Sequence, residues 1–220
     1  MNPAERMVTQ RYRDKAVNLR QLIFVVLIAL SMPIAVEAQD YSSDVNWLIE
    51  VLELKEGAVV ADIGAGDGDQ TLEIARYIGP EGHIYSTELG SESLQELRGE
   101  ISSASPGNVT VLEGHPARTN LPAECCDAIY MRRVYHHFGD PPSMNASLLR
   151  SLKPGGRLAI IDFEPRGSEA DPGARASGRQ HGVTAETVVK ELTKAGFILV
   201  SNDDRPGRNF YLVLEKPEDS

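Results

Sequence analysis

The sequence predicts an α/β fold: a doubly wound, mostly parallel β-sheet with helices on both faces and a C-terminal antiparallel hairpin. Short apolar runs alternate with segments of helical period over residues 59–195, which favours a parallel sheet. A glycine-rich loop at 64–68 follows the first of these runs. Near the C-terminus, the apolar runs 197–202 and 210–216 are joined by a connection too short for a parallel crossover.

The first strand is predicted at residues 59–63, where an apolar run typical of a buried parallel strand contains one acidic residue. Glycines then recur at alternate positions, which allows a tight turn and a close approach of backbone to ligand. Residues 71–78 have helical spacing, so the loop opens a helix whose free N–H groups face the crevice. The residues of this segment that are candidates for a nucleotide-type site are Asp62, Gly64, Ala65, Gly66 and Gly68.

The remaining elements follow in alternation. We predict strands at 82–88, 109–113, 127–131 and 157–163, and helices at 91–103, 145–152 and 184–195, with a turn at 153–156. Thr184 suits the N-cap of the last helix and Gly196 lies just after its end. The hairpin strands complete a seven-stranded sheet.

The Asp-x-Gly-x-Gly-x-Gly pattern of residues 62–68 resembles motif I of the class I S-adenosylmethionine-dependent methyltransferases. Residues 152–163 resemble the corresponding segment of that family, and the His-His-Phe at 136–138 is similar to that of its small-molecule branch, the ubiquinone/menaquinone-biosynthesis type. The resemblance covers about 44–216. It implies a Rossmann-like sheet of order 3-2-1-4-5-7-6, S-adenosyl-L-methionine as cofactor and direct in-line methyl transfer to a small-molecule acceptor.

A dinucleotide oxidoreductase is the weaker alternative. The third glycine of the loop, Gly68, comes one residue too early for a G-x-G-x-x-G fingerprint, and Asp69 occupies the fingerprint position. No second domain remains for a hydride acceptor.

The resemblance assigns roles around the cofactor. Asp62 lies near the methionine part, the glycine loop lies beneath it, and Glu88 reaches the ribose, at a spacing of twenty residues from Gly68. Gly114 and His115 fall where the family has Gly-Asp beside adenine, so the adenine contact comes from their backbone or from the His115 ring. The alternative to these ligand-binding roles is that Glu88 is a charged residue at the N-terminus of the next helix and that Gly114 lies in a surface turn.

Three residues after the fourth strand, Tyr135, His136 and His137, are the catalytic candidates, because ligands of open α/β sheets lie outside the carboxyl ends of the strands. One of them could act as a general base; the alternative is that they pack as the first turn of the next helix. We predict no metal site, because adjacent histidines on a helix diverge and no third ligand is near in sequence. His181 ends the long loop 164–183, which either closes over substrate or is solvated.

The N-terminal segment resembles a secretory signal peptide. Residues 1–21 carry a net charge of +3, an apolar run follows at 22–30, and small residues precede a cleavage position after Ala38. We therefore expect a signal peptide or signal anchor at 1–38, a methyltransferase domain at 39–220, and an exported protein. A translation start later in the sequence would instead leave it cytoplasmic. Membrane contact is expected only through an uncleaved N-terminal segment.

The formal net charge of −10 argues against a nucleic-acid partner, since binding a phosphate backbone requires a basic surface. This favours a small-molecule methyl acceptor. The adjacent Cys125 and Cys126 are not expected to form a disulfide, because their side chains would point to opposite faces of a strand. The alternative function is an exported cofactor-binding domain without catalytic activity, which the replacement of the adenine-side Asp by His115 also fits.

Overall fold

The computed structural model describes residues 43–204 and 207–218, and the described residues from Val45 onward belong to one compact unit. The expected signal peptide at 1–38 lies outside the described residues. Within the described ranges, none of the helices has the length and apolar character needed to cross a membrane.

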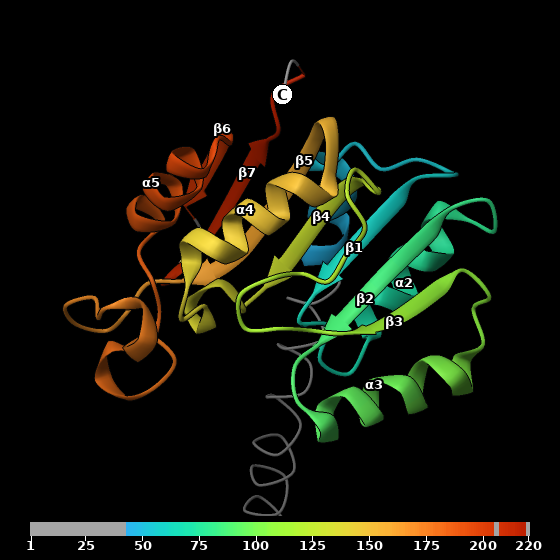
Figure 1. Cartoon of the computed structure of the whole chain (residues 1–220), viewed down its shortest axis with the longest axis horizontal. Helices are drawn as coiled ribbons and strands as arrows, with labels where there is room; N and C mark the ends of the chain where they lie inside the picture. Colours follow the sequence, from blue (N-terminus) through green and yellow to red (C-terminus); the bar gives the residue numbers. More distant parts are fainter. Residues whose placement is uncertain (1–42, 205–206, 219–220) are drawn as a thin grey trace, which may run out of the picture. The chain divides into compact units, whose positions relative to one another are not determined.

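The chain forms a seven-stranded sheet of order β3-β2-β1-β4-β5-β7-β6, which confirms the predicted topology (Figure 1). The strands are β1 (Val59–Ile63), β2 (His83–Glu88), β3 (Val109–Glu113), β4 (Cys126–Arg132), β5 (Leu152–Phe163), β6 (Ile198–Asp204) and β7 (Asn209–Glu215). The helices are α2 (Asp69–Ile78), α3 (Ser91–Ala104), α4 (Pro141–Ser151) and α5 (Ala185–Ala195), and residues 45–51 are also helical. Strand β7 runs opposite to the other six strands and pairs antiparallel with β5 and β6.

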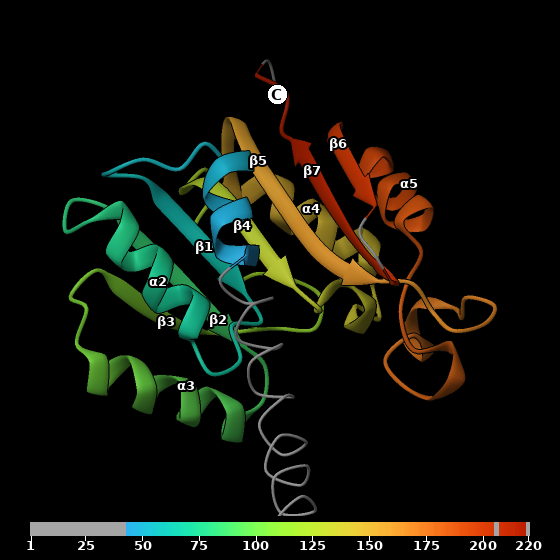
Figure 2. The ribbon, with the colours of Figure 1, turned by 180° about the vertical axis from the view of Figure 1, so that it is seen from behind.

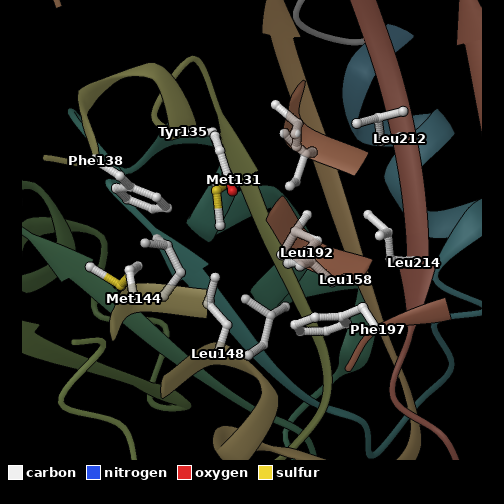
Figure 3. Close-up of a cluster of buried hydrophobic side chains, with 14 of the residues drawn as sticks. Met131, Tyr135, Phe138, Met144, Leu148, Leu158, Leu192, Phe197, Leu212 and Leu214 are labelled. Atoms are coloured by element: carbon white, nitrogen blue, oxygen red, sulfur yellow. The ribbon is translucent and has the colours of Figure 1, made fainter. Parts of the chain in front are cut away.

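Helices cover both faces of the sheet. Alternate residues of the central strands point to opposite faces, so Ile129 and Met131 pack in one cluster while Ala128 and Tyr130 pack in the other. Helices α4 and α5 cover the first face, and Figure 3 shows Met144, Leu148 and Leu192 among the side chains there. Helix α2 and the helix at 45–51 cover the second face (Figure 2).

Two boundaries differ from the prediction by more than two residues. Helix α4 begins at Pro141 rather than 145, because the Asp140 side chain accepts the Ser143 N–H as an N-cap and proline fits the first helical position. Strand β5 begins at Leu152 and includes the segment expected as a turn. There Lys216 closes hydrogen bonds with Gly155 and Gly156, which pair this segment with the end of the last strand although Gly155 itself has a φ of +71°.

The expectation that Cys125 and Cys126 stay unpaired is wrong, since they form a disulfide. The alternation argument applies only inside a strand, and β4 begins at Cys126. Cys125 precedes it, so its side chain is free of the strand's alternation and reaches that of its neighbour.

The carboxyl ends of five parallel strands, β1 to β5, meet at one edge of the sheet. The loops after them are the glycine loop, the start of α3, the turn at 114–118, the segment 133–137 and the long loop 164–183. The fold therefore brings the segments that carry the predicted site residues to one side of the sheet.

Candidate active site

The glycine loop is tied to the end of β2 by backbone hydrogen bonds. The N–H groups of Gly64 and Ala65 both donate to the Thr87 carbonyl at 2.9 Å, and the Gly66 N–H donates to the Glu88 carboxylate at 2.7 Å. The other oxygen of Glu88 accepts the Leu89 N–H at 2.8 Å. Glu88 therefore fixes the position of the loop while its carboxylate still faces the crevice.

Glycine is required at the start of this loop. Gly64 has a φ of +73°, and a Cβ there would lie 2.5 Å from Cγ2 of Val134, in the segment after β4. Gly68 has a φ of +84° at the N-cap of α2, where a Cβ would lie 2.8 Å from Cδ1 of Leu97. Gly66 has a φ of +58° with open space beside it, so its backbone is accessible to a ligand.

Asp62 supports the loop from below. Its carboxylate is buried and accepts hydrogen bonds from the hydroxyls of Thr71, at 2.6 Å, and Tyr130, at 2.7 Å. Burial raises its pKa to about 6, against the lowering effect of these two bonds. Asp62 thus links β1, β4 and the first turn of α2, and acts on the site through the backbone it holds.

A cavity of about 460 Å³ opens at this edge of the sheet. Five of the predicted site residues line it, and these are Gly64, Glu88, Gly114, His115 and His137. Its lining does not include the other predicted ones, which are Asp62, Ala65, Gly66, Gly68, Tyr135 and His136. The cavity thus connects the three segments expected to hold ribose, adenine and acceptor.

The turn after β3 closes one end of the cavity. The Gly114 N–H donates to the Glu88 carbonyl at 2.8 Å, and a Cβ on Gly114 would lie 3.1 Å from that oxygen. Nδ1 of His115 accepts the Ala117 N–H at 3.1 Å, so the ring proton of neutral His115 belongs on Nε2. His115 therefore presents a donor where the family's aspartate would present an acceptor.

Sequence reasoning missed the positive charge of the cavity. Arg118, Arg132 and Arg133 all line it, together with the single acid Glu88. Arg133 has a φ of +57°, and its N–H donates to the Ile161 carbonyl at 2.7 Å. The sequence shows the arginine pair at the end of the fourth strand, but it does not show that both residues line the cavity.

Tyr135 lies in the core beneath the site. Its hydroxyl donates to Glu191 of α5 at 2.9 Å and accepts from the Asn145 amide at 2.8 Å. Burial raises the pKa of this phenol, and Figure 3 shows the ring among buried side chains beside Phe138 and Met131. This placement gives Tyr135 the role of joining the segment after β4 to α4 and α5.

His136 and His137 occupy a short 3₁₀ turn over residues 135–137, and His181 of the long loop comes to meet them. The ring of His136 is buried and bonds to Asp162 at 2.8 Å through Nδ1, and its Nε2 lies 3.1 Å from Nε2 of His181. The three rings place one nitrogen each within 4.8 Å of one another. His181 is not near these residues in sequence, as noted above, but the long loop brings it back to this turn.

The environment favours the neutral forms of two of these rings. Burial lowers the pKa of His137, and the neighbouring His136 lowers it further. Burial and His136 also lower the pKa of His181. Neutral imidazoles keep one nitrogen lone pair, which can accept a proton or bind a metal ion.

The long loop is held at its centre by Arg175. This buried guanidinium pairs with Glu169 of the same loop at 3.3 Å and with Glu191 of α5 at 3.0 Å, and it donates to the Ala170 carbonyl. The Val183 N–H then donates to the Phe163 carbonyl at 3.1 Å and closes the loop's base. These contacts position His181 over the turn that carries His136.

The sequence profile of the methyltransferase domain family matches residues 54–198. The chain is 33% identical over 119 residues to the ubiquinone/menaquinone biosynthesis C-methyltransferase UbiE of Saccharophagus degradans, covering 54% of this chain and 48% of that protein. It is 31% identical over 122 residues to the protein-L-isoaspartate O-methyltransferase of Ignicoccus hospitalis, covering 55% of each chain. The matches thus span about half the length of these curated relatives.

The fold agrees with the crystal structure of a SAM-dependent methyltransferase from Aquifex aeolicus, with a TM-score of 0.67 and 24% identity. That match covers 78% of this chain and 89% of the other. The family profile covers most of the sheet and the whole cavity edge described above. The chain therefore belongs to the class I S-adenosylmethionine-dependent methyltransferase family, whose cofactor is S-adenosyl-L-methionine.

Proposed function

We propose that this protein transfers the methyl group of S-adenosylmethionine to a small-molecule acceptor that meets it beside His137. The observation that carries the proposal is the single cavity that runs from Glu88, Gly114 and His115 to His137. Its volume of about 460 Å³ suits a small-molecule site.

The residues at the cofactor end fit that ligand. Glu88 uses one lone pair of each oxygen on a backbone N–H, which leaves further lone pairs for two ribose hydroxyls. The open space beside Gly66 admits a close approach of ligand to backbone. The Nε2–H of His115 can donate to a ring nitrogen of adenine.

The bound cofactor supplies an electrophilic methyl on a sulfonium whose leaving group is a neutral thioether, so no protein acid is needed. The chain therefore contributes mainly orientation. His137, the only one of the three predicted catalytic residues in the cavity lining, is the residue that we assign to the acceptor's reacting group.

The charge of the cavity favours an acceptor with an acidic group. Three arginines and one acid line it, although the whole chain has a formal net charge of −10. A carboxylate or phosphate would pair with a guanidinium in such a site. Arg133, exposed and beside the 3₁₀ turn, is the arginine closest in sequence to His137.

The test is an acceptor screen on the full chain with methyl-labelled S-adenosylmethionine. Small acidic hydroxyl, amine and thiol compounds are expected to gain label, and neutral analogues to gain less. His137→Ala should lower kcat, whereas His83→Ala, on the far part of β2, should not change it. Cofactor binding without transfer to any acceptor would instead support a cofactor-binding domain that does not catalyse.

A further inference from the structure

Three histidine rings converge at the edge of the sheet. Their ligand nitrogens lie within 4.8 Å of one another, and those of His136 and His181 are 3.1 Å apart. A tetrahedral zinc ion with Zn–N bonds of about 2.0–2.1 Å separates its nitrogen ligands by about 3.3 Å, so the His136–His181 pair already has this spacing and the exposed His137 ring would turn toward the ion to complete the set. We propose that His136, His137 and His181 bind one divalent transition-metal ion, with zinc as the best match.

Asp162 orients the first of these ligands. Its side chain is fully buried, and its carboxylate accepts from the His136 ring at 2.8 Å, from the His136 N–H at 3.1 Å and from the Phe163 N–H at 2.9 Å. Because Nδ1 of His136 donates to Asp162, its Nε2 presents a lone pair toward His181. A buried carboxylate behind a histidine is the usual outer shell of a zinc ligand, where it fixes the tautomer and raises basicity.

A direct hydrogen bond between the rings of His136 and His181 is the alternative explanation of the 3.1 Å contact. That hydrogen bond involves only two histidines and does not explain why the ring of the third lies beside them. His137 lies beside both, with ring centroids 4.1 Å from His136 and 6.4 Å from His181. The convergence of all three rings is what an ion explains and a single hydrogen bond does not.

The donor set selects the kind of ion. Three imidazoles suit zinc and the neighbouring transition metals, whereas magnesium and calcium prefer oxygen ligands. Three protein ligands leave a fourth position open, as in catalytic zinc sites. Because His137 also lines the cavity, that position faces the proposed acceptor.

The use of the ion, unlike its binding, rests on the proposed function. An acceptor hydroxyl or thiol bound at the fourth position releases its proton to solvent and presents an anionic oxygen or sulfur. This atom forms the new bond to the methyl carbon, while the bond from carbon to the sulfonium breaks and its electron pair stays on sulfur. His137 then acts on the acceptor through the ion.

The experiment is a metal titration of the tag-free full chain after treatment with a chelator, with Zn²⁺ followed by calorimetry and Co²⁺ by its visible spectrum. A single ion per chain and the intense bands of tetrahedral cobalt are expected. His137→Ala and His181→Ala, on the exposed side of the cluster, should weaken binding by ~100-fold or more, and Asp162→Asn by ~10–100-fold. His83→Ala removes a histidine outside the cluster and should leave binding unchanged.

Two results would overturn the site: no binding by the folded wild-type chain, or equal binding by wild type, His137→Ala and His181→Ala. Circular dichroism of each variant verifies that it is folded. A parallel titration with S-adenosylhomocysteine separates the two proposals. Metal binding without cofactor binding would contradict the proposed function alone, and cofactor binding without metal binding would contradict the metal site alone.

Discussion

The carboxylate of Glu88 accepts the backbone N–H of Gly66 at 2.7 Å, although the two residues are 22 positions apart. This bond joins the glycine loop after β1 to the end of β2. The same carboxylate also lines the cavity. A single side chain therefore sets the shape of the loop and faces the cavity in which we propose that the cofactor binds.

Gly64→Ala is expected to lower the free energy of unfolding by about 1–3 kcal/mol, because the position has a positive φ and the new Cβ meets Val134. Chemical denaturation measures the change. Gly99→Ala is the matched control: Gly99 lies in α3 with nothing within 4 Å of its added Cβ, and the change should stabilise by about 0.5–1 kcal/mol. Equal effects of the two substitutions would show that the loop does not need its glycine.

Asp62 should make stability fall as the pH rises. Its pKa of about 6 in the folded chain exceeds the ordinary value of 3.8, so the native state binds this proton more tightly than the unfolded state. As the pH rises from 3.8 to 6, ionisation of Asp62 therefore lowers the free energy of unfolding by up to about 3 kcal/mol, and above pH 6 the full loss is present. Asp62→Asn keeps one oxygen to accept from Thr71 and Tyr130, and removes this dependence.

The measurement is chemical denaturation of wild type and Asp62→Asn from pH 4 to pH 7.5. The stability of the variant relative to wild type should increase across that range. Glu73→Gln, an exposed substitution on α2, should follow wild type. Parallel curves for wild type and Asp62→Asn would contradict the raised pKa.

Arg175→Ala should release the long loop, because it leaves Glu169 and Glu191 without their buried cation. We expect a loss of about 2 kcal/mol or more and new protease cleavage within 164–183. Arg179→Ala, at an exposed arginine of the same loop, should change neither. An unchanged cleavage pattern in Arg175→Ala would mean that other contacts hold the loop.

The sheet order, the glycine loop and the place of Glu88 were predictable because each depends on patterns within short stretches of sequence. Alternating patterns mark strands and helices, and parallel strands of this topology bring their carboxyl ends together. The start of α4 was also readable, since Asp140 before two prolines is an N-cap signal.

The histidine cluster was not predictable in the same way. His181 is 45 residues from His136 and lies in a loop without periodicity. Long-range contacts such as the pairing of Arg175 with Glu191 bring it back, and these are not visible in the sequence. Tyr135 shows the same limit at short range. Within one 3₁₀ turn, the side chain of Tyr135 faces the core, whereas that of His137, two residues later, faces the cavity.

The most direct test is calorimetric titration of the full chain with S-adenosylhomocysteine, comparing wild type, Glu88→Gln and Glu92→Gln. Wild type and Glu92→Gln, which alters an exposed acid in the first turn of α3, should bind in the micromolar range, about −8 kcal/mol. Glu88→Gln should bind ~10–100-fold more weakly, because the glycine loop and the ligand lose bonds to a charged acceptor. Undiminished binding by Glu88→Gln, or none by the folded wild type, would contradict the proposed cofactor site.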